Sequence, residues 1–353
     1  MQELKLTDFP YSNPGFGRRV TVVAVGSAGC TIASQLSNES RLLEHFVYIS
    51  CDEHDLASVT KGDRVLIDTP INGKTSPYVI RGLAHEKLPE IRRKLQDSEV
   101  VLIISGLGGM VGSGLAPLVA CEASPKRAVT LAILVMPSSF QHEKHFFAGS
   151  ALKQIRKHVA GVIIVDNDEL RRDVPLIDSY AETNQKIALA LNKLLGTPEQ
   201  HEFSIGLSNV VRSVMAKSYS VLSIGDSVEH HGYRDAVMNA ARGFDATVDV
   251  SQASKSLVHL CADKSITMNE LITSIGGLSG VLGDGTMQIE YGLSASSTTP
   301  TSTAIIVATG FTSTKFDSYD PVDAAIRSKG ENLDSDMDGF VNLESLVPNV
   351  ERD

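Results

Sequence analysis

The sequence lacks tryptophan altogether, has only four cysteines, and has no long apolar run. Without tryptophan, stacking of nucleic-acid bases on indole rings is excluded. The cysteines, Cys30, Cys51, Cys121 and Cys261, are scattered and lack the close pairs of zinc sites or redox motifs, so we predict buried free thiols. No apolar stretch is long enough to span a bilayer, and residues 1–19 lack the apolar core of a signal peptide. We therefore expect a cytoplasmic protein.

Basic residues are also in the minority. The chain carries 32 Lys and Arg against 42 Asp and Glu, which gives a net charge of −10. A nucleic-acid-binding surface needs a basic stripe, so we expect no nucleic-acid partner. The 353 residues, 42% of them hydrophobic, are enough for about two domains with their own cores.

The sequence does contain a dense run of glycines at residues 106–114, between an apolar run at residues 100–104 and a helix-like segment at residues 115–123. In such a turn the backbone N–H groups can surround an anion, and the helix dipole adds positive potential. The run lacks the Lys-Ser/Thr pair of a P-loop, so a Walker-type NTPase is not indicated. An anion cradle and a ligand-free tight turn are the two readings of this run.

Short apolar segments alternate with amphipathic ones up to residue 165, which predicts a parallel sheet with crossover helices. The strands are expected at residues 20–25, 46–51, 100–104, 129–136 and 162–165. Ligands gather at the carboxyl ends of such strands, where this chain has glycines and polar residues. The first turn, residues 26–29, does not complete the dinucleotide motif GxGxxG. Residues 61–77 are expected to form a loop.

We predict five consecutive units along the chain. They are a flexible N-terminal arm at 1–18, a nucleotide-binding α/β domain at 19–177, a long central helix at 178–197, a smaller α+β domain at 198–311 and a flexible acidic tail at 312–353. Within the tail, residues 334–339 copy the first half of a calcium-binding loop, but Ser345 stands where the closing Glu belongs. An acidic tail is the simpler reading, and residues 340–350 are apolar enough for a short partner-binding peptide.

These segments follow the order found in the tubulin/FtsZ superfamily, including the archaeal FtsZ and CetZ branches, which the chain resembles over residues 18–311. Residues 26–29 look like its first phosphate loop, residues 108–114 like its GGGTGTG signature, and residues 167–168 like its guanine-binding Asn-Asp pair. Tyr180 and Asn184 are similar to the aromatic residue and the Asn of the central helix, which hold the base by stacking and hydrogen bonds.

The resemblance implies GTP or GDP as the ligand, with Mg²⁺ accompanying GTP. The nucleotide-binding residues that it implies are Gly26, Ser27, Ala28, Gly29, Asp52, Gly106, Gly108, Gly109, Met110, Val111, Gly112, Ser113, Gly114, Pro137, Asn167, Tyr180 and Asn184.

The chain departs from the family at the phosphate signature and the ribose-side loop. Met110 replaces a Gly and narrows the cradle, and Val111 replaces a Thr whose hydroxyl can donate to a phosphate. We therefore expect either weakened phosphate binding or exclusion of the terminal phosphate. Gln141, His142 and His145 stand where FtsZ usually carries Glu, Gly and Arg.

The second departure concerns hydrolysis. In this family, carboxylates on a loop of the neighbouring subunit position the attacking water, because a weak nucleophile must be oriented and relieved of a proton. Here Leu207 and Val210 align with the two Asp of FtsZ, and residues 203–215 contain no Asp or Glu. Glu202 is the nearest acid. We predict weak or absent hydrolysis and assign no catalytic residue.

The resemblance implies a cytoskeletal protein of the FtsZ/CetZ type that self-assembles longitudinally and serves cell division or cell shape. Its tail would bind a membrane anchor or a division protein. Two alternatives stay open: an active GTPase coupled to polymerisation, with the acids outside the aligned register, and a non-polymerising regulatory homologue that caps or joins a related filament.

Overall fold

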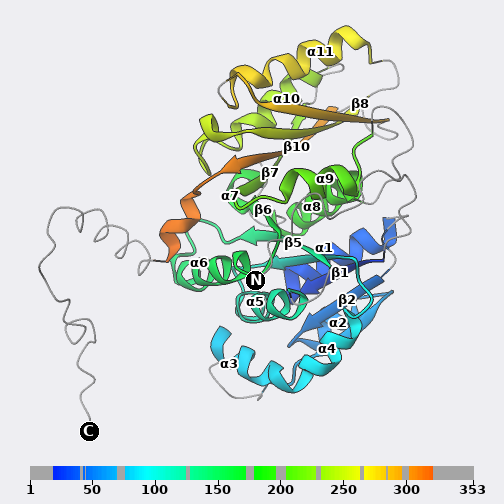
Figure 1. The fold of residues 1–353 in the computed structure, drawn as a ribbon, viewed down its shortest axis with the longest axis vertical. Helices are drawn as coiled ribbons and strands as arrows, with labels where there is room; N and C mark the ends of the chain where they lie inside the picture. The colour runs from blue at the N-terminus through cyan, green and yellow to red at the C-terminus, as the bar shows by residue number, and fades with distance from the viewer. Residues whose placement is uncertain are drawn as a thin grey trace, which may run out of the picture.

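The computed structural model describes residues 19–39, 43, 45–69, 76–124, 128–171, 179–195, 204–227, 232–262, 266–283, 285–295 and 302–320. Their strands form a single 10-stranded sheet in the order β3-β2-β1-β4-β5-β6-β7-β10-β8-β9 (Figure 1). The strands are β1 (Val20–Val25), β2 (His45–Ser50), β3 (Asp63–Leu66), β4 (Val100–Gly106), β5 (Val129–Met136), β6 (Gly161–Asp166), β7 (Tyr219–Ser227), β8 (Lys255–Ala262), β9 (Gln288–Ala295) and β10 (Ser302–Phe311).

Helices connect these strands and cover both faces of the sheet (Figure 1). The α-helices are α1 (Gly26–Glu39), α2 (Glu53–Ala57), α3 (Pro77–Leu83), α4 (Leu88–Lys94), α5 (Met110–Ala123), α6 (His142–Arg156), α7 (Asn167–Leu170), α8 (Ser179–Leu195), α9 (Leu207–Val214), α10 (Tyr233–Arg242) and α11 (Met268–Gly276). The 3₁₀ turns are η2 (Ala84–Lys87), η3 (Val250–Gln252), η4 (Leu278–Gly280) and η5 (Lys315–Tyr319).

Strands β1 to β7 are joined by parallel pairings only, as the alternation of strands and helices predicted. β3 is a correction, because it lies inside the predicted loop at 61–77. It is a four-residue edge strand of which Val65 alone is buried. Its polar start, Asp63 and Arg64, therefore has the composition of a loop.

The second half of the chain extends the same sheet. β10 runs antiparallel to β7 and β8, and β7 runs parallel to β6, with Val162↔Tyr219 to Val165↔Leu222 in register. The predicted architecture, a parallel-sheet nucleotide-binding fold with a long helix and a mixed α+β unit, is confirmed. The structure adds that both units share one sheet, while the domain boundaries themselves stay a prediction.

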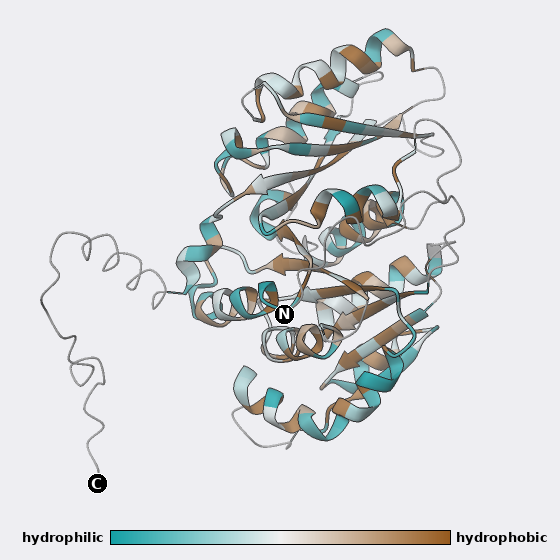
Figure 2. Ribbon diagram, in the orientation of Figure 1, coloured by the Kyte–Doolittle hydropathy of each residue, from teal (hydrophilic) through white to brown (hydrophobic). Residues whose placement is uncertain are grey.

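The two faces of the sheet carry separate apolar cores because side chains alternate along each strand. In β1, Val23 and Val25 belong to the core that also contains side chains of α3 to α6 and α10. Val22 and Ala24 belong to the core that contains side chains of α1, α8 and α9. Burial on both faces explains the uninterrupted apolar runs of the central strands, which are brown in Figure 2.

Residues 314–319, which belong to the predicted tail at 312–353, contact the rest of the fold. Thr314 caps η5 through a hydrogen bond to the N–H of Phe316, whose side chain is fully buried. The Tyr319 ring stacks on His145 of α6 with 3.6 Å between ring centroids. These contacts order residues 314–319 against α6. Residues 1–18 and 321–353, with the motif at 334–339, lie outside the described residues, as does Glu202.

In the part of the chain that the structure describes, no helix combines the length and the apolar character that crossing a membrane requires.

Candidate functional site

The carboxyl ends of the central strands β1, β4, β5 and β6 bring together segments that are far apart in the sequence. Gly26 follows β1, Gly106 ends β4, Pro137 follows β5 and Asn167 follows β6. Because these four strands are neighbours and parallel, their carboxyl ends lie along one edge of the sheet. We call this edge the carboxyl edge, and ligands of open α/β sheets bind at such edges.

The helix that follows the glycine run begins at Met110, five residues before the predicted start at 115. Gly109 is its N-cap residue and has no side chain to accept a hydrogen bond. The first intrahelical bond runs from the N–H of Ser113 to the carbonyl of Gly109 at 3.0 Å. The N–H groups of residues 110–112 therefore have no partner within the helix and are positioned to bind an anion.

Two glycines hold the first turn against this helix start. Gly26 has φ +72°, and a Cβ there would lie 3.2 Å from the backbone nitrogen of Gly112. A Cβ on Gly112 would lie 2.0 Å from the carbonyl oxygen of Gly106, so no other residue fits. By contrast, a Cβ on Gly109 would meet nothing within 4 Å. The cradle is thus tightly packed at Gly26 and Gly112, whereas the space beside Gly109 is open.

Several other predicted site residues have packing roles at the same edge. A Cβ on Gly29 would lie 2.4 Å from the carbonyl oxygen of Ile104, and one on Gly114 would lie 2.7 Å from that of Pro77. Likewise, a Cβ on Gly106 would lie 2.9 Å from the Cβ of Ala28, and one on Gly108 would lie 3.2 Å from the Cβ of Pro137. These residues let backbone segments approach one another closely.

The side chains of the glycine run divide between core and solvent. Ser113 is buried, and its hydroxyl donates to the carbonyl of Leu107 at 2.7 Å, so it holds the turn. Val111 is half-buried and packs on the core, while the Met110 side chain is 49% exposed. The two substituted positions thus differ, with Val111 at the packed side of the cradle and Met110 in solvent.

An acid that the sequence did not single out contacts the first turn. The Asp55 carboxylate accepts hydrogen bonds from the hydroxyls of Ser27 at 2.5 Å and Ser50 at 2.6 Å. The predicted Asp52 instead caps α2 and accepts from the N–H of His54 at 2.8 Å. The sequence does contain a signal for Asp55. Asp52 is a typical N-cap residue, and in a helix that begins after it the third residue, Asp55, lies near the end of the preceding strand.

The predicted base-binding residues lie beside the loop after β5. Asn167 is buried at the start of α7, and Asn184 is half-buried on α8 one turn after Tyr180. The Arg171 guanidinium lies over the Tyr180 ring, 4.1 Å from its centroid, and Gln141 donates to the Tyr180 hydroxyl at 3.2 Å. Sequence reasoning missed Arg171, since only the fold brings it to Tyr180.

A buried charge network lies immediately behind Asn167. Asp166 is 2% exposed and accepts hydrogen bonds from the Thr247 hydroxyl at 2.6 Å and the Lys315 ammonium at 2.5 Å. The neighbouring Asp168 accepts from the N–H of Ser139 at 2.8 Å. Burial raises the pKa of Asp168, but the hydrogen bonds from Ser139 and the Lys315 charge outweigh it, so this pKa lies below its ordinary value. Asp168 is therefore ionised and anchors the loop after β5.

The two positions that align with the FtsZ acids lie on α9. Val210 is fully buried, and Leu207 is half-buried against the same core. Residues 204–214 contain no carboxylate. A carboxylate does reach α9 from β9: Glu290 accepts from the Asn209 side chain at 3.1 Å and pairs with Lys255 at 2.7 Å. Sequence reasoning missed Glu290 because it is 81 residues from Asn209.

Comparison with known proteins agrees with this geometry. The model of the tubulin/FtsZ family GTPase domain matches residues 19–175. The cell division protein FtsZ 1 of Methanocaldococcus jannaschii is 26% identical over 262 residues, which are 71% of this chain and 72% of that protein. FtsZ 1 of Halobacterium salinarum is 27% identical over 267 residues, 71% of this chain and 66% of that protein.

Solved structures share the fold. An FtsZ dimer from M. jannaschii superposes with a TM-score of 0.72 at 23% identity, covering 83% of this chain and 88% of that one. CetZ2 from Haloferax volcanii, solved as a GTPγS-bound protofilament, superposes with a TM-score of 0.69 at 21% identity. The match covers 89% of this chain and 99% of that one. Residues 19–175, which carry the glycine cradle at the carboxyl edge, therefore match the GTPase domain of the tubulin/FtsZ family.

Proposed function

We propose that the chain binds GTP or GDP at the carboxyl edge. The observation that carries the proposal is the open start of α5, where three N–H groups without helical partners adjoin Gly26 on the same edge as Asn167. GTP carries Mg²⁺ on its phosphates, and Asp55, which contacts the first turn through Ser27, is the carboxylate we propose beside that ion. Chromatography of nucleotides released from the denatured protein tests the site. Absence of bound nucleotide, together with no uptake of added GTP or GDP, would overturn it.

We further propose that copies of the chain associate head to tail through the carboxyl edge. Six of the ten large apolar side chains that are exposed among the described residues lie in the loop after β5 or in the first two turns of helices that start at or beside this edge: Tyr78, Val79, Met110, Phe140, Phe146 and Tyr180. Such concentration of exposed apolar surface is typical of an interaction site. Sedimentation and electron microscopy with GTP test this proposal, and monomers under every nucleotide condition would contradict it.

Hydrolysis by such an assembly would be weak. The buried apolar side chain of Val210 stands where the family places an acid that orients the attacking water. Phosphate release should therefore stay slow per subunit as the protein concentration rises. A rate per subunit that climbs beyond a threshold concentration would favour an active GTPase instead.

One observation favours that second candidate. Glu290 places a carboxylate beside Asn209 on the first turn of α9. Burial raises the pKa of Glu290, but hydrogen bonds from Lys255 and Asn209 outweigh this effect. The pKa therefore lies below its ordinary value, and Glu290 is ionised. Glu290→Gln would abolish concentration-dependent phosphate release if Glu290 replaced the missing acids. It would leave the slow basal rate unchanged if hydrolysis is simply weak.

For the wider role we propose a cytoplasmic cytoskeletal protein in cell division or cell shape. A non-polymerising homologue that caps or joins a related filament is the remaining candidate, and residues 321–353 are the proposed contact for a membrane anchor or division protein. If the chain forms no filaments alone but co-sediments with a filament-forming relative, the capping role is favoured.

A further inference from the structure

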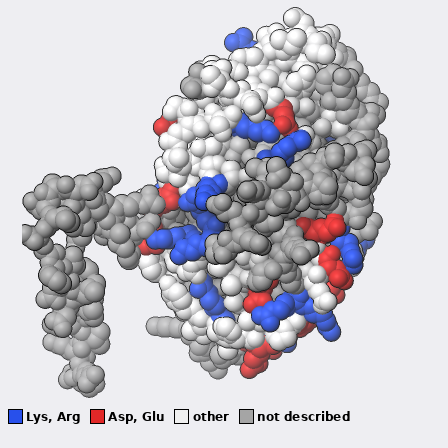
Figure 3. Space-filling view, viewed as in Figure 1, with Lys and Arg blue, Asp and Glu red and all other residues white. Residues whose placement is uncertain are grey.

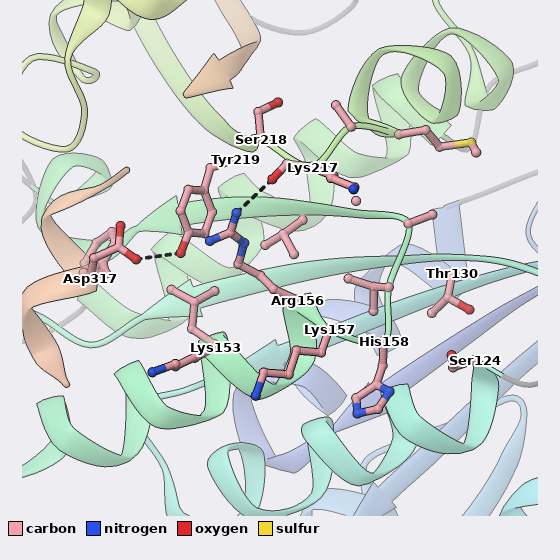
Figure 4. A pocket seen from close by; sticks show the side chains of 18 of the residues that line it. Ser124, Thr130, Lys153, Arg156, Lys157, His158, Lys217, Ser218, Tyr219 and Asp317 are labelled. Atoms are coloured by element: carbon pink, nitrogen blue, oxygen red, sulfur yellow. Dashed lines mark hydrogen bonds between the residues drawn. The ribbon is translucent and has the colours of Figure 1, made fainter. Parts of the chain in front are cut away.

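A groove of about 830 Å³ lies at the edge of the sheet opposite to the carboxyl edge (Figure 4). Its walls are the last turn of α6, the first residues of β5, β6 and β7, and η5. The apolar part of the lining includes Leu152, Val159 and Met215. The nucleotide-site residues described above are not among its lining residues, so the groove is a separate feature.

The groove is predominantly cationic. Four Lys and Arg line it against two Asp, and Figure 3 shows Lys and Arg side chains gathered on this face of the molecule. Two of these charged groups are engaged internally. The Arg156 guanidinium lies over the Tyr219 ring at 3.7 Å and donates to the carbonyl of Lys217 at 2.8 Å, and Asp317 accepts from the Tyr219 hydroxyl at 2.8 Å.

Two other cations of the groove, Lys157 and Lys217, are available to a ligand. Lys157 and Lys217 are exposed, and neither forms an ion pair with any residue that the structure describes. Figure 4 shows Lys153, Lys157 and His158 projecting from the end of α6 and the residues after it. A cationic rim around an apolar floor is complementary to a peptide that carries both acidic and apolar side chains.

The described chain ends at Asp320, which itself lines this groove. Residues 334–347 contain four Asp and Glu, five side chains among Phe, Val and Leu, and no Lys or Arg. Fourteen residue-to-residue steps (334 − 320 = 14) separate Asp320 from Asp334. Fully extended they span at most about 50 Å, so the segment can reach any part of a groove that begins at Asp320. The covalent link also raises its effective concentration to about the millimolar range.

We propose that residues 334–347 of the same chain dock in the groove. Their carboxylates pair with Lys157 and Lys217, and their apolar side chains cover Val159 and Met215. The half-formed calcium motif at residues 334–339 thus serves as an acidic docking segment. This proposal does not depend on nucleotide binding or on self-assembly.

Hydrogen exchange of the full chain at low ionic strength tests the docking. The amides of residues 334–347 should exchange about tenfold more slowly than an unstructured peptide of the same sequence. The variant Lys157→Glu/Lys217→Glu should remove this protection, as should 1 M salt, where the screening length falls to about 3 Å. The matched control Lys61→Glu/Arg93→Glu reverses two exposed charges near β3 and α4 and should retain it.

A charge swap makes the result specific. Asp336→Lys/Asp338→Lys should also lose protection, and its combination with Lys157→Glu/Lys217→Glu should regain it. Unchanged exchange of the β5 and β6 amides shows that each variant is folded. Exchange of residues 334–347 at the unstructured rate in the wild type, or protection that survives reversal of Lys157 and Lys217, would overturn the proposal. Protection that grows with protein concentration would assign the groove to another copy's segment and overturn docking within the chain.

Discussion

Lys315 and Asp166 form an ion pair, with Nζ 2.5 Å from the carboxylate, that fastens the segment after β10 to the carboxyl end of β6. Asp166 is almost completely buried, and the residue after it is Asn167 of the candidate nucleotide site. A position of the chain that its sequence assigns to a tail therefore supports the floor of this site.

Lys315→Met should lower the free energy of unfolding by about 3 kcal/mol, because it leaves a buried carboxylate without its counter-ion. Urea unfolding measures the change. The double variant Lys315→Met/Asp166→Asn should recover part of the loss, since the uncompensated charge is gone. A single variant as stable as the wild type would show that the Thr247 hydroxyl and solvent satisfy Asp166 without Lys315.

Asn184→Ala should weaken GDP binding by about tenfold or more, because base donors would be left unpaired in the pocket. The matched control is Leu189→Ala, which truncates an exposed side chain on the same helix and should leave affinity unchanged. Titration calorimetry with GDP gives both affinities. Equal affinity of wild type and Asn184→Ala would contradict the proposed position of the base.

Met110→Gly combined with Val111→Thr should tighten GTP binding by about tenfold, because a hydroxyl regains a hydrogen bond to a charged phosphate. Cys121→Ala, at the exposed end of the same helix, is the control and should have no effect. Affinities of the two variants for GTP and GDP provide the comparison. If GTP affinity does not change, Met110 and Val111 do not weaken phosphate binding: either the cradle already binds phosphate without hindrance, or it does not bind phosphate at all.

His259 should make the protein less stable in mild acid. Burial, with a smaller contribution from the Lys193 charge, lowers the pKa of His259 from 6.5 to about 4. Between these values the unfolded chain binds a proton that the folded chain does not, so stability is complete above pH 6.5 and falls as the pH decreases toward 4. The loss from this group between pH 7 and pH 5 is about 2 kcal/mol.

His259→Gln tests this assignment because glutamine can keep the hydrogen bond to Ser294, 3.0 Å from Nε2, but does not titrate. Urea unfolding at the two pH values should show a smaller pH dependence in the variant than in the wild type, whatever their stabilities at pH 7. The same pH dependence in both proteins would mean that other groups cause it.

Local sequence was sufficient to predict the strands and helices whose apolar residues follow a regular pattern. The strand Val20–Val25 is buried along its whole length and is almost entirely apolar, and the second half of α8 has apolar residues at helical spacing. The start of α5 was missed because the glycines at 112 and 114, which the close backbone contacts require, disfavour a helix by propensity. β3 was missed because an edge strand of four residues buries little apolar surface and so has no clear apolar pattern.

The side-chain partners within the site could not be predicted locally, since they join distant positions. Lys315 is 149 residues from Asp166 (315 − 166 = 149), and Glu290 is 81 residues from Asn209. The family resemblance located the segments that approach the ligand, but not Arg171 over Tyr180 or Asp55 against Ser27. Such pairs depend on how the elements pack, which no short window of sequence contains.

The pairing of β6 with β7 has a mechanical consequence. Only four register pairs join the two halves of the sheet there, against six between β1 and β4 and seven between β4 and β5. A force that pulls the two halves apart would load this short ladder together with α8 and the contacts of η5 on β6 and α6. The junction therefore sets how stiffly strain at one end of the molecule is transmitted to the other.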